Sequence, residues 1–186
     1  MSKGTQETEI KLVAKDTRSA RRLLRAAGFM VSRPRVFEAN MVFDTPELIL
    51  RNSSSLLRIR QAGGVATMTY KGVPEPGNYK SREELELKID NPGAMMAIVE
   101  RLGFHCVFRY EKYRTEFRQP RRAGVAMLDE TPLGVYLELE GTPHWIDLSA
   151  RRLGYQKSGY ITDSYARLYL DWCAANGCQP GDMTFA

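Results

Sequence analysis

The sequence predicts an α+β protein in which about eight antiparallel strands close into a β-barrel, with helices packed on the outside of the barrel. Three observations support this prediction. Four segments repeat apolar residues with the period of a helix, and eight segments repeat them with the period of a strand. In most of the strand-like segments, nearly every position of the polar face carries a full charge.

Four segments have the features of amphipathic helices. Each carries an apolar stripe at helical spacing, a Thr, Asp or Asn residue lies at or near its start, and glycine directly follows three of the four. We interpret the stripes as faces that pack against the sheet. The predicted helices are residues 16–27, 92–102, 143–153 and 163–175.

The segments between these helices alternate apolar and polar residues, as half-buried strands do. Gly63-Gly64 predicts a tight hairpin turn between two of them, and Asp44-Thr45-Pro46 ends the second strand. The predicted strands are residues 6–13, 36–43, 55–62, 65–71, 80–89, 104–118, 124–129 and 134–140.

The polar faces of these strands are charged to an unusual degree. In residues 104–118, for example, Lys112, Arg114 and Glu116 share one face. Any one such strand, taken alone, is best explained by an open sheet with one solvated face. Acidic residues are uncommon in strands, however, and gathering many charges on one curved surface is costly unless ions or ligands neutralise them. A closed barrel with a charged bore and an apolar outside therefore accounts for the whole pattern.

The length and composition are typical of a globular protein. The chain has 186 residues, of which 43% are hydrophobic and 26% charged, and its net charge of +5 favours an anionic partner. No apolar run reaches the roughly 20 residues of a membrane helix, and residues 1–6 lack the apolar stretch of a secretory signal. We therefore expect a cytoplasmic protein that does not bind a membrane, with a single domain over residues 1–186. The three cysteines and two histidines lack the spacing of a metal site.

The charges of the predicted bore indicate its ligand. Lysine and arginine bind phosphate oxygens, and carboxylates are the ligands that Mg²⁺ and Mn²⁺ prefer. Cations beside carboxylates suit a polyphosphate held with a divalent metal ion, whereas nucleic-acid grooves combine cations with aromatic residues and few carboxylates. We therefore expect a triphosphate substrate with Mg²⁺ or Mn²⁺, and no nucleic acid. The candidate phosphate-binding residues are Lys11, Arg58, Arg60, Lys71, Lys112 and Arg114, and the candidate metal ligands are Glu7, Glu9, Asp129, Glu138 and Glu140.

The segment Glu7-Thr8-Glu9-Ile10-Lys11 resembles the E-x-E-x-K signature of the CYTH superfamily, which is named for class IV adenylyl cyclases and thiamine triphosphatases. Further motifs follow in the order of that family through most of the chain. They are Phe43-Asp44-Thr45-Pro46, Leu56-Leu57-Arg58-Ile59-Arg60, Thr69-Tyr70-Lys71-Gly72, Arg82-Glu83-Glu84-Leu85-Glu86, Lys112-Tyr113-Arg114, Leu128-Asp129-Glu130 and Leu137-Glu138-Leu139-Glu140.

The resemblance implies a tunnel of eight antiparallel strands, open at both ends, in which a triphosphate is cleaved. The Asp163-Ser164-Tyr165 segment matches a Ser-Tyr pair near a closing C-terminal helix of the family, and we interpret Tyr165 as a packed side chain rather than a catalytic one. Arg82, Glu84 and Glu86 would line the bore and orient their neighbours, and the role of general base would fall to metal-activated water or to one of the carboxylates Glu84 and Glu86. By residue-to-residue match, Lys11, Arg58 and Lys112 would be catalytic, Lys11, Arg58, Arg60, Lys71, Arg82, Lys112 and Arg114 would bind the triphosphate, and Glu7, Glu9, Asp129, Glu138 and Glu140 would hold one or two metal ions.

Three functions fit these residues. Hydrolysis releases orthophosphate from inorganic triphosphate, thiamine triphosphate or a nucleotide, and cyclisation converts ATP to cyclic AMP and pyrophosphate. The spacing from Tyr70-Lys71-Gly72 to Ser81-Arg82 looks like that of the class IV cyclases, but no motif indicates an adenine pocket, and we favour hydrolysis. A module that binds polyphosphate or an RNA 5′ end without turnover is less favoured, because anion binding needs no set of five carboxylates. Many members of the family pair into homodimers, so a homodimer stays an open alternative.

Overall fold

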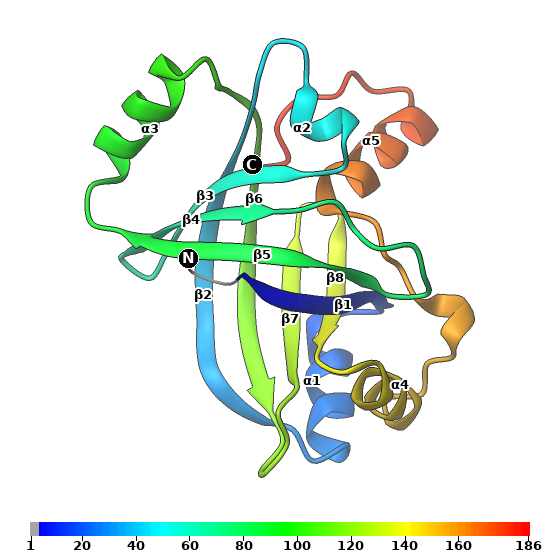
Figure 1. The fold of residues 1–186 in the computed structure, drawn as a ribbon. Coiled ribbons are helices and arrows are strands. Elements are labelled where there is room, and N and C mark those ends of the chain that lie inside the picture. The colour runs from blue at the N-terminus through cyan, green and yellow to red at the C-terminus, as the bar shows by residue number, and fades with distance from the viewer. Residues whose placement is uncertain (1–3) are drawn as a thin grey trace.

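The computed structural model describes residues 4–186 and contains a barrel of eight antiparallel strands in the order β1-β5-β4-β3-β2-β6-β7-β8 (Figure 1). This arrangement confirms the predicted closed barrel with helices on its outside. The strands are β1 (Thr5–Ala14), β2 (Met30–Asp44), β3 (Leu56–Ala62), β4 (Val65–Lys71), β5 (Lys80–Ile89), β6 (His105–Arg118), β7 (Val125–Thr131) and β8 (Gly134–Glu140).

Five α-helices lie around the barrel within the described range, and each of the four predicted helices corresponds to one of them. None is long and apolar enough to cross a membrane. The helices are α1 (Thr17–Ala26), α2 (Ile49–Asn52), α3 (Pro92–Arg101), α4 (Pro143–Arg152) and α5 (Tyr165–Asn176), and a 3₁₀ turn spans Lys157–Gly159.

Strand β1 closes the barrel by pairing with two different neighbours. Its first half pairs with β5 over Thr5–Glu9, and its second half pairs with β8 over Glu9–Ala14. Glu9 is the point of exchange, because it lies opposite Lys80 on one side and Glu140 on the other. As Figure 1 shows, β3, β4, β5 and β1 run across β2, β6, β7 and β8, so the barrel consists of two crossing groups of strands.

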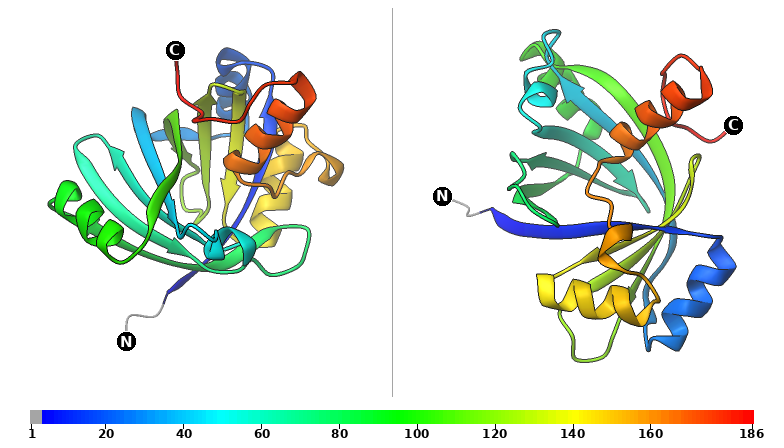
Figure 2. Two further views of the ribbon diagram at one scale, coloured as in Figure 1. Left: turned by 90° about the horizontal axis from the view of Figure 1, so that it is seen from above. Right: turned by 90° about the vertical axis from the view of Figure 1, so that its right-hand side faces the viewer.

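The main apolar core lies outside the barrel rather than inside it. Outward residues of β1, β7 and β8 form one buried cluster with α1 and α4. Figure 2 shows these two helices side by side at one end of the barrel, with α5 at the opposite end. Burying a leucine or isoleucine stabilises a fold by about 1.5–3 kcal/mol, so this cluster is a main source of stability. Its fully buried members include Ile10, Leu12, Leu24, Leu128, Leu137, Leu139 and Ile146.

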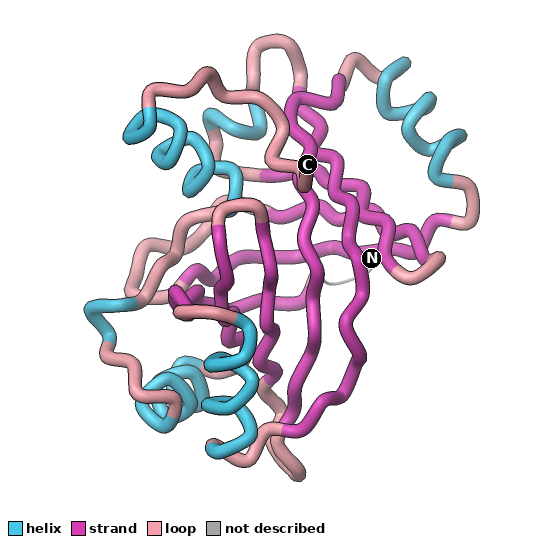
Figure 3. The backbone as a smooth tube through the Cα atoms, turned by 180° about the vertical axis from the view of Figure 1, so that it is seen from behind, coloured by secondary structure: helices cyan, strands magenta, loops and turns pink. Residues whose placement is uncertain are grey.

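Two smaller apolar clusters attach α3 and α5. Val99 of α3 packs with Phe43 and Ile59 on the outer face of β2 and β3. Tyr165 of α5 packs with Tyr110 of β6 and with Met183 from the C-terminal segment. Seen from behind in Figure 3, the helices lie at the periphery and the strands form a continuous wall between them. The inside of that wall is therefore left to polar side chains.

Local signals in the sequence account for most element boundaries. The side chains of Asp16, Asn91 and Thr142 each accept a hydrogen bond from a backbone N–H in the first turn of α1, α3 and α4, as N-cap residues do. Gly63 and Gly64 have φ values of 55° and 79°, which a tight hairpin turn with two left-handed residues requires.

Three features of the fold differ from the prediction. Strand β2 begins at Met30 instead of residue 36, and its pairing with β6 shifts register between Arg33 and Val36. Pro34 lies in this irregular stretch, where its missing N–H interrupts no regular ladder. Helix α2 was not predicted, because four residues are too few to show a helical period. The apolar stripe of residues 163–175, which was predicted to pack against the sheet and includes Trp172, is wrong at that residue, because Trp172 is 47% exposed and stacks on Tyr169.

Candidate active site

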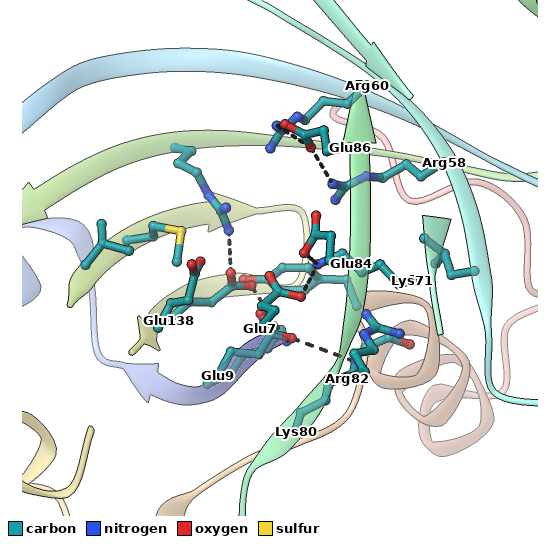
Figure 4. Close-up of a pocket in the computed structure, with 18 of the residues that line it drawn as sticks. Glu7, Glu9, Arg58, Arg60, Lys71, Lys80, Arg82, Glu84, Glu86 and Glu138 are labelled. Carbon is teal, nitrogen blue, oxygen red and sulfur yellow. Dashed lines mark hydrogen bonds and ion pairs between the residues drawn. The ribbon is translucent and has the colours of Figure 1, made fainter. Parts of the chain in front are cut away.

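The barrel encloses a cavity of about 530 Å³ that is lined mainly by charged side chains. They come from β1, β3, β4, β5, β6 and β8, and Figure 4 shows the labelled ones pointing toward one another. The cavity brings together thirteen of the fourteen predicted site residues, and Asp129 is the exception. The thirteen are Glu7, Glu9, Lys11, Arg58, Arg60, Lys71, Arg82, Glu84, Glu86, Lys112, Arg114, Glu138 and Glu140.

Strand pairing explains why residues far apart in the sequence meet here. Lys11 lies directly opposite Glu138, and Glu9 lies opposite both Lys80 and Glu140. Directly opposed residues of an antiparallel ladder point to the same face, so these five side chains enter the cavity together. The two N-terminal motif residues thus reach the wall formed by the last strand of the barrel.

On the β3–β5 side of the cavity, basic and acidic side chains neutralise one another. Lys71 Nζ contacts the carboxylate of Glu7 and lies 2.9 Å from Glu84 Oε2. Arg60 Nη2 lies 3.2 Å from Glu86 Oε2. These ion pairs hold the cations in the wall, and a bound phosphate would compete with the carboxylates for the same N–H donors.

On the β6–β8 side, one carboxylate of the inner face is covered by its neighbours, although its strand partner Arg114 lines the cavity. Asp129 is completely buried and accepts hydrogen bonds from Lys112 Nζ at 2.8 Å, from Arg114 Nε at 2.7 Å and from the Tyr165 hydroxyl at 2.8 Å. Arg114 also donates to Glu138, which does line the cavity. Asp129 therefore differs from the other predicted metal ligands, since its oxygens face basic residues instead of the cavity.

Burial and mutual repulsion act on the carboxylates of the cavity. Burial, opposed by Lys71 and reinforced by the charge of Glu9, raises the pKa of Glu7 to about 7. Burial and then the charge of Glu9 also raise the pKa of Glu140. Burial has the same tendency at Glu9, but Lys11 prevails and lowers the pKa of Glu9 to about 2. Burial thus disfavours the charged forms of Glu7 and Glu140, whereas nearby cations favour the charged form of Glu9.

The carboxylates that line the cavity fit a divalent metal ion by their chemistry. Glu7, Glu9, Glu138 and Glu140 supply the hard oxygen ligands that Mg²⁺ or Mn²⁺ prefers. Across residues 4–186, however, no three acidic, histidine or cysteine side chains already converge as a metal-binding cluster. A metal ion here would complete its coordination with water and substrate oxygens, as Mg²⁺ commonly does in phosphate-binding sites.

Several charged residues of the site were not predicted, namely Glu38, Lys80, Glu116 and Arg118. Glu38 of β2 is 3% exposed, and its oxygens lie 3.7 Å from Lys112 Nζ and 3.8 Å from Arg60 Nη1. Lys80 of β5 lines the cavity with its Nζ 3.9 Å from Glu9. Burial and then the positive charge of Lys11 lower the pKa of Lys80 to about 7. Lys80 begins a strand whose alternation places it on the face of Arg82, so the sequence did carry a signal for it.

Two tyrosines of the site were also not predicted to take part in it. Tyr110 lines the cavity, and its hydroxyl accepts a hydrogen bond from Arg58 Nη1 at 3.3 Å. It shares a face of β6 with Lys112, so strand alternation could have identified it. Tyr165 was correctly expected to pack at the start of a helix, but no sequence signal indicated that its hydroxyl reaches Asp129.

A second cavity of about 1020 Å³ adjoins the first. Lys80, Arg82 and Ser164 line both cavities, which shows that they meet between β5 and the start of α5. The second cavity is bordered by α2, α5 and the ends of β2 and β6, and it has apolar side chains that the first lacks, among them Phe43 and Phe108.

Comparison with known proteins shows to which family this barrel belongs. A family model described as the CYTH domain matches residues 5–165, which include every strand and the start of α5. The chain is a member of the CYTH family. This finding confirms the resemblance inferred from the E-x-E-x-K motif and the motifs that follow it.

Relatives of this CYTH protein are known from sequence and from structure. It is 32% identical over 134 residues to a protein of Methanocaldococcus jannaschii named "Putative adenylate cyclase MJ0240", covering 72% of this chain and 75% of the relative. The PH1819 protein of Pyrococcus horikoshii has the same fold, with a TM-score of 0.74 and 24% identity over 89% of this chain and 99% of its own. A Hippeastrum protein described as "Putative adenylyl cyclase HpAC1", with "a dominant triphophatase activity", has a TM-score of 0.62 and 21% identity over 94% and 97% of the two chains.

Proposed function

We propose that this CYTH protein is a divalent-metal-dependent triphosphatase that cleaves a triphosphate inside the barrel. The observation that carries the proposal is the enclosed cavity in which nine basic and seven acidic side chains face one another. The basic side chains of the cavity outnumber the acidic ones by two, and a bound divalent cation would add two further positive charges to the cavity. The side chains and the cation together would suit a short, compact polyanion such as a triphosphate better than the long backbone of a nucleic acid.

The basic side chains would bind and orient the triphosphate. Arg58 projects from β3, and Lys112 and Arg114 project from β6 on the other side of β2, so together they would contact several phosphate oxygens. Phosphoryl transfer depends mainly on positioning and on stabilising charge at the phosphoryl oxygens. We assign Lys11, Arg58 and Lys112 to the reacting phosphate, and Arg60, Lys71, Arg82 and Arg114 to binding the rest of the chain of phosphates.

The acidic side chains would hold the metal ion and the attacking water. Glu7, Glu9, Glu138 and Glu140 would be the metal ligands, and the ion would withdraw charge from the phosphoryl oxygens that it contacts. In hydrolysis the oxygen of water forms a bond to the terminal phosphorus, the bond from that phosphorus to its bridging oxygen breaks, and orthophosphate leaves. Glu84 or Glu86 would accept the proton that water releases, because both carboxylates line the cavity beside the cations.

Cyclisation of ATP is the second candidate. The M. jannaschii relative is named as a cyclase, and the adjoining cavity of about 1020 Å³ leaves room for a nucleoside next to the phosphates. A cyclase name alone decides little, since the Hippeastrum protein combines such a name with a dominant triphosphatase activity. We favour hydrolysis because water needs no nucleoside-specific contact to reach the terminal phosphate.

Product analysis distinguishes these reactions. The purified protein is incubated with Mg²⁺ or Mn²⁺ and, separately, with inorganic triphosphate, thiamine triphosphate or ATP, and products are identified by chromatography. Orthophosphate with a shortened phosphate chain supports the triphosphatase, and cyclic AMP with pyrophosphate identifies a cyclase. Tight triphosphate binding without turnover in either metal would overturn both and indicate a binding module. A parallel reaction with EDTA tests the requirement for a metal ion.

A further inference from the structure

Both oxygens of Asp129 already accept hydrogen bonds from neighbouring side chains. Its Oδ1 accepts a hydrogen bond from Arg114 Nε at 2.7 Å, and its Oδ2 accepts bonds from Lys112 Nζ at 2.8 Å, Arg114 Nη2 at 2.6 Å and the Tyr165 hydroxyl at 2.8 Å. A carboxylate offers about four acceptor positions, so four donors, three of them on Oδ2, already engage most of its capacity. Asp129 is also completely buried and does not line the cavity, in contrast to Glu138 and Glu140.

Tyr165 is placed to support two basic residues of the cavity, one of which is also held by Asp129. Its ring is 5% exposed, and the ammonium groups of Lys11 and Lys112 lie 5.3 Å and 5.0 Å from the ring centroid. A cation over an aromatic face is attracted to it, more strongly when the pair is shielded from water. The ring of Tyr165 thus lies against Lys112, and its hydroxyl donates to Asp129, which also binds Lys112.

The position of Tyr165 is fixed by the packing of α5. Ser164 caps the helix by accepting a hydrogen bond from Arg167 N. Beyond α5, Met183 is 1% exposed and exchanges backbone hydrogen bonds with Arg109 and Glu111 of β6. Ile161, just before α5, exchanges backbone hydrogen bonds with Lys11 of β1, so both ends of the segment are attached to the barrel and the start of α5 is a fixed support for the cavity wall.

We propose that Tyr165 and Asp129 are positioning residues: the Tyr165 hydroxyl orients Asp129, and Asp129 holds Lys112 and Arg114 extended toward the triphosphate, without itself binding the metal ion. The inference rests on the proposed function and deepens it. Lysine and arginine side chains lose up to about 2 kcal/mol of rotamer freedom each when they are fixed. Fixing them before the substrate binds removes this cost from the binding and cleavage steps.

A metal ligand and a positioning residue differ in what their loss changes. Replacing a ligand raises the metal concentration needed for half-maximal activity. Replacing a positioning residue behind Lys112 and Arg114 raises the KM for the triphosphate and lowers kcat, while the metal requirement stays as it was. Glu140 provides the comparison, because it lines the cavity and is proposed as a ligand.

The experiment compares Tyr165→Phe, Asp129→Asn and Glu140→Gln by steady-state kinetics over a range of Mg²⁺ and triphosphate concentrations. Tyr165→Phe keeps the ring and removes only the hydroxyl, so we expect kcat/KM to fall about tenfold, the effect of losing one hydrogen bond to a charged group. Asp129→Asn should cost about 100-fold or more, because it removes the charge that Lys112 and Arg114 share. Neither should change the half-saturating Mg²⁺ concentration, whereas Glu140→Gln should raise it.

Tyr169→Phe is the matched control, since Tyr169 lies one turn along α5 and packs on Phe108 and Trp172 away from the cavity ions. It should match the wild type in every measurement. Thermal unfolding of each variant shows whether it is folded, and if Asp129→Asn does not fold, Tyr165→Phe alone decides the question.

Each outcome supports or overturns the proposal. If Tyr165→Phe equals the wild type, or if Asp129→Asn raises the Mg²⁺ requirement as Glu140→Gln does, the positioning role is wrong and the triphosphatase proposal stands. If the wild type neither cleaves a triphosphate nor binds a non-hydrolysable triphosphate analogue in calorimetry, both proposals fail together.

Discussion

The two faces of strand β1 are equally buried and opposite in chemistry. Ile10 and Leu12 point outward, and both are 0% exposed in the apolar cluster with α1 and α4. Glu9 and Lys11 point inward, are 6% and 3% exposed, and line the charged cavity. Consecutive residues of this strand are therefore all buried, but their surroundings alternate between apolar side chains and charged ones.

This contrast separates the source of stability from the source of function. Removing apolar surface from water favours folding, whereas burying charges costs free energy even when they are paired. The free energy gained by apolar burial on the outer face must therefore offset the cost of burying charges on the inner face. Substitutions on the outer face should act on unfolding, and substitutions on the inner face should act on binding and turnover.

The largest expected effect is the loss of activity from the inner face. Lys11→Ala and Glu138→Gln should each lower kcat by at least about 100-fold, because each removes a group proposed to stabilise the reacting phosphate or its metal ion. Both variants should remain folded by circular dichroism. Lys88→Ala is the control for lysine removal, as Lys88 lies on the same strand face as Arg82 but outside the cavity. Full activity of either inner-face variant would contradict the roles assigned here.

The next effect is a loss of stability from the outer face. Leu128→Ala should lower the free energy of unfolding by about 2–5 kcal/mol in urea titrations, because Leu128 is fully buried between the barrel and its helices. Turnover should be unchanged at temperatures where the variant is folded. Leu87→Ala, on the outer face of β5 but 54% exposed, should cost less than about 0.5 kcal/mol. Equal losses at both positions would show that burial against the helices is not what stabilises the barrel.

A smaller effect is expected where the two cavities meet. Lys80→Met should weaken triphosphate binding about tenfold in calorimetric titrations, because one buried phosphate-facing cation is lost. We expect no loss of stability, since burial already disfavours the charged form of Lys80 and lowers its pKa. Lys88→Met controls for the change of side chain on the same strand. Unchanged binding in Lys80→Met would remove Lys80 from the phosphate site.

The smallest effect is expected at an ionic contact on the outside of the barrel. Asp147 of α4 accepts hydrogen bonds from Tyr79 at 2.8 Å and Tyr160 at 3.1 Å and pairs with Lys157 at 2.6 Å. Burial opposes ionisation, but these donors prevail and lower the pKa of Asp147. Because the folded pKa is below the unfolded one, the stabilisation is present above the ordinary aspartate pKa and is lost as the pH falls through the lowered value.

Asp147→Asn should therefore lower the melting temperature slightly at neutral pH, and the difference from the wild type should disappear in acid. Melting curves of the two proteins between neutral pH and the acid limit of folding provide the measurement. A difference that persisted or grew in acid would show that the ionised carboxylate is not what stabilises this contact.

Much of the fold and of the cavity could be predicted because the strand period and the charges agree. Every charged face residue predicted to point into the bore from β1 and β3 does so, since a period of two admits only two assignments per strand. The turn at Gly63-Gly64 and the caps at Asp16, Asn91 and Thr142 were likewise local features. Local chemistry was therefore enough to identify them.

The parts that were not predicted depend on contacts between distant segments. Glu38 is a single acidic residue in a largely apolar stretch, and only closure of the barrel brings it to Lys112 and Arg60. Tyr165 is typical of a packed helix start, and its hydroxyl meets Asp129 only because α5 folds back over the barrel. Asp129 belongs to a family motif, and an aspartate is a suitable metal ligand. In the folded chain, however, its carboxylate contacts Lys112, Arg114 and Tyr165.

The exchange of partners by β1 at Glu9 links the completion of folding to the appearance of the site. The pairs Glu9–Glu140 and Lys11–Glu138 join residues that are more than 120 positions apart in sequence, and closing such a long loop costs conformational entropy. A molecule that has not yet joined its first strand to its last has an open sheet, with Glu9 and Glu140 on separate edges. Incompletely folded chains would thus be unable to capture metal ions or triphosphates in this way, and catalytic competence would itself report that the last seam has closed.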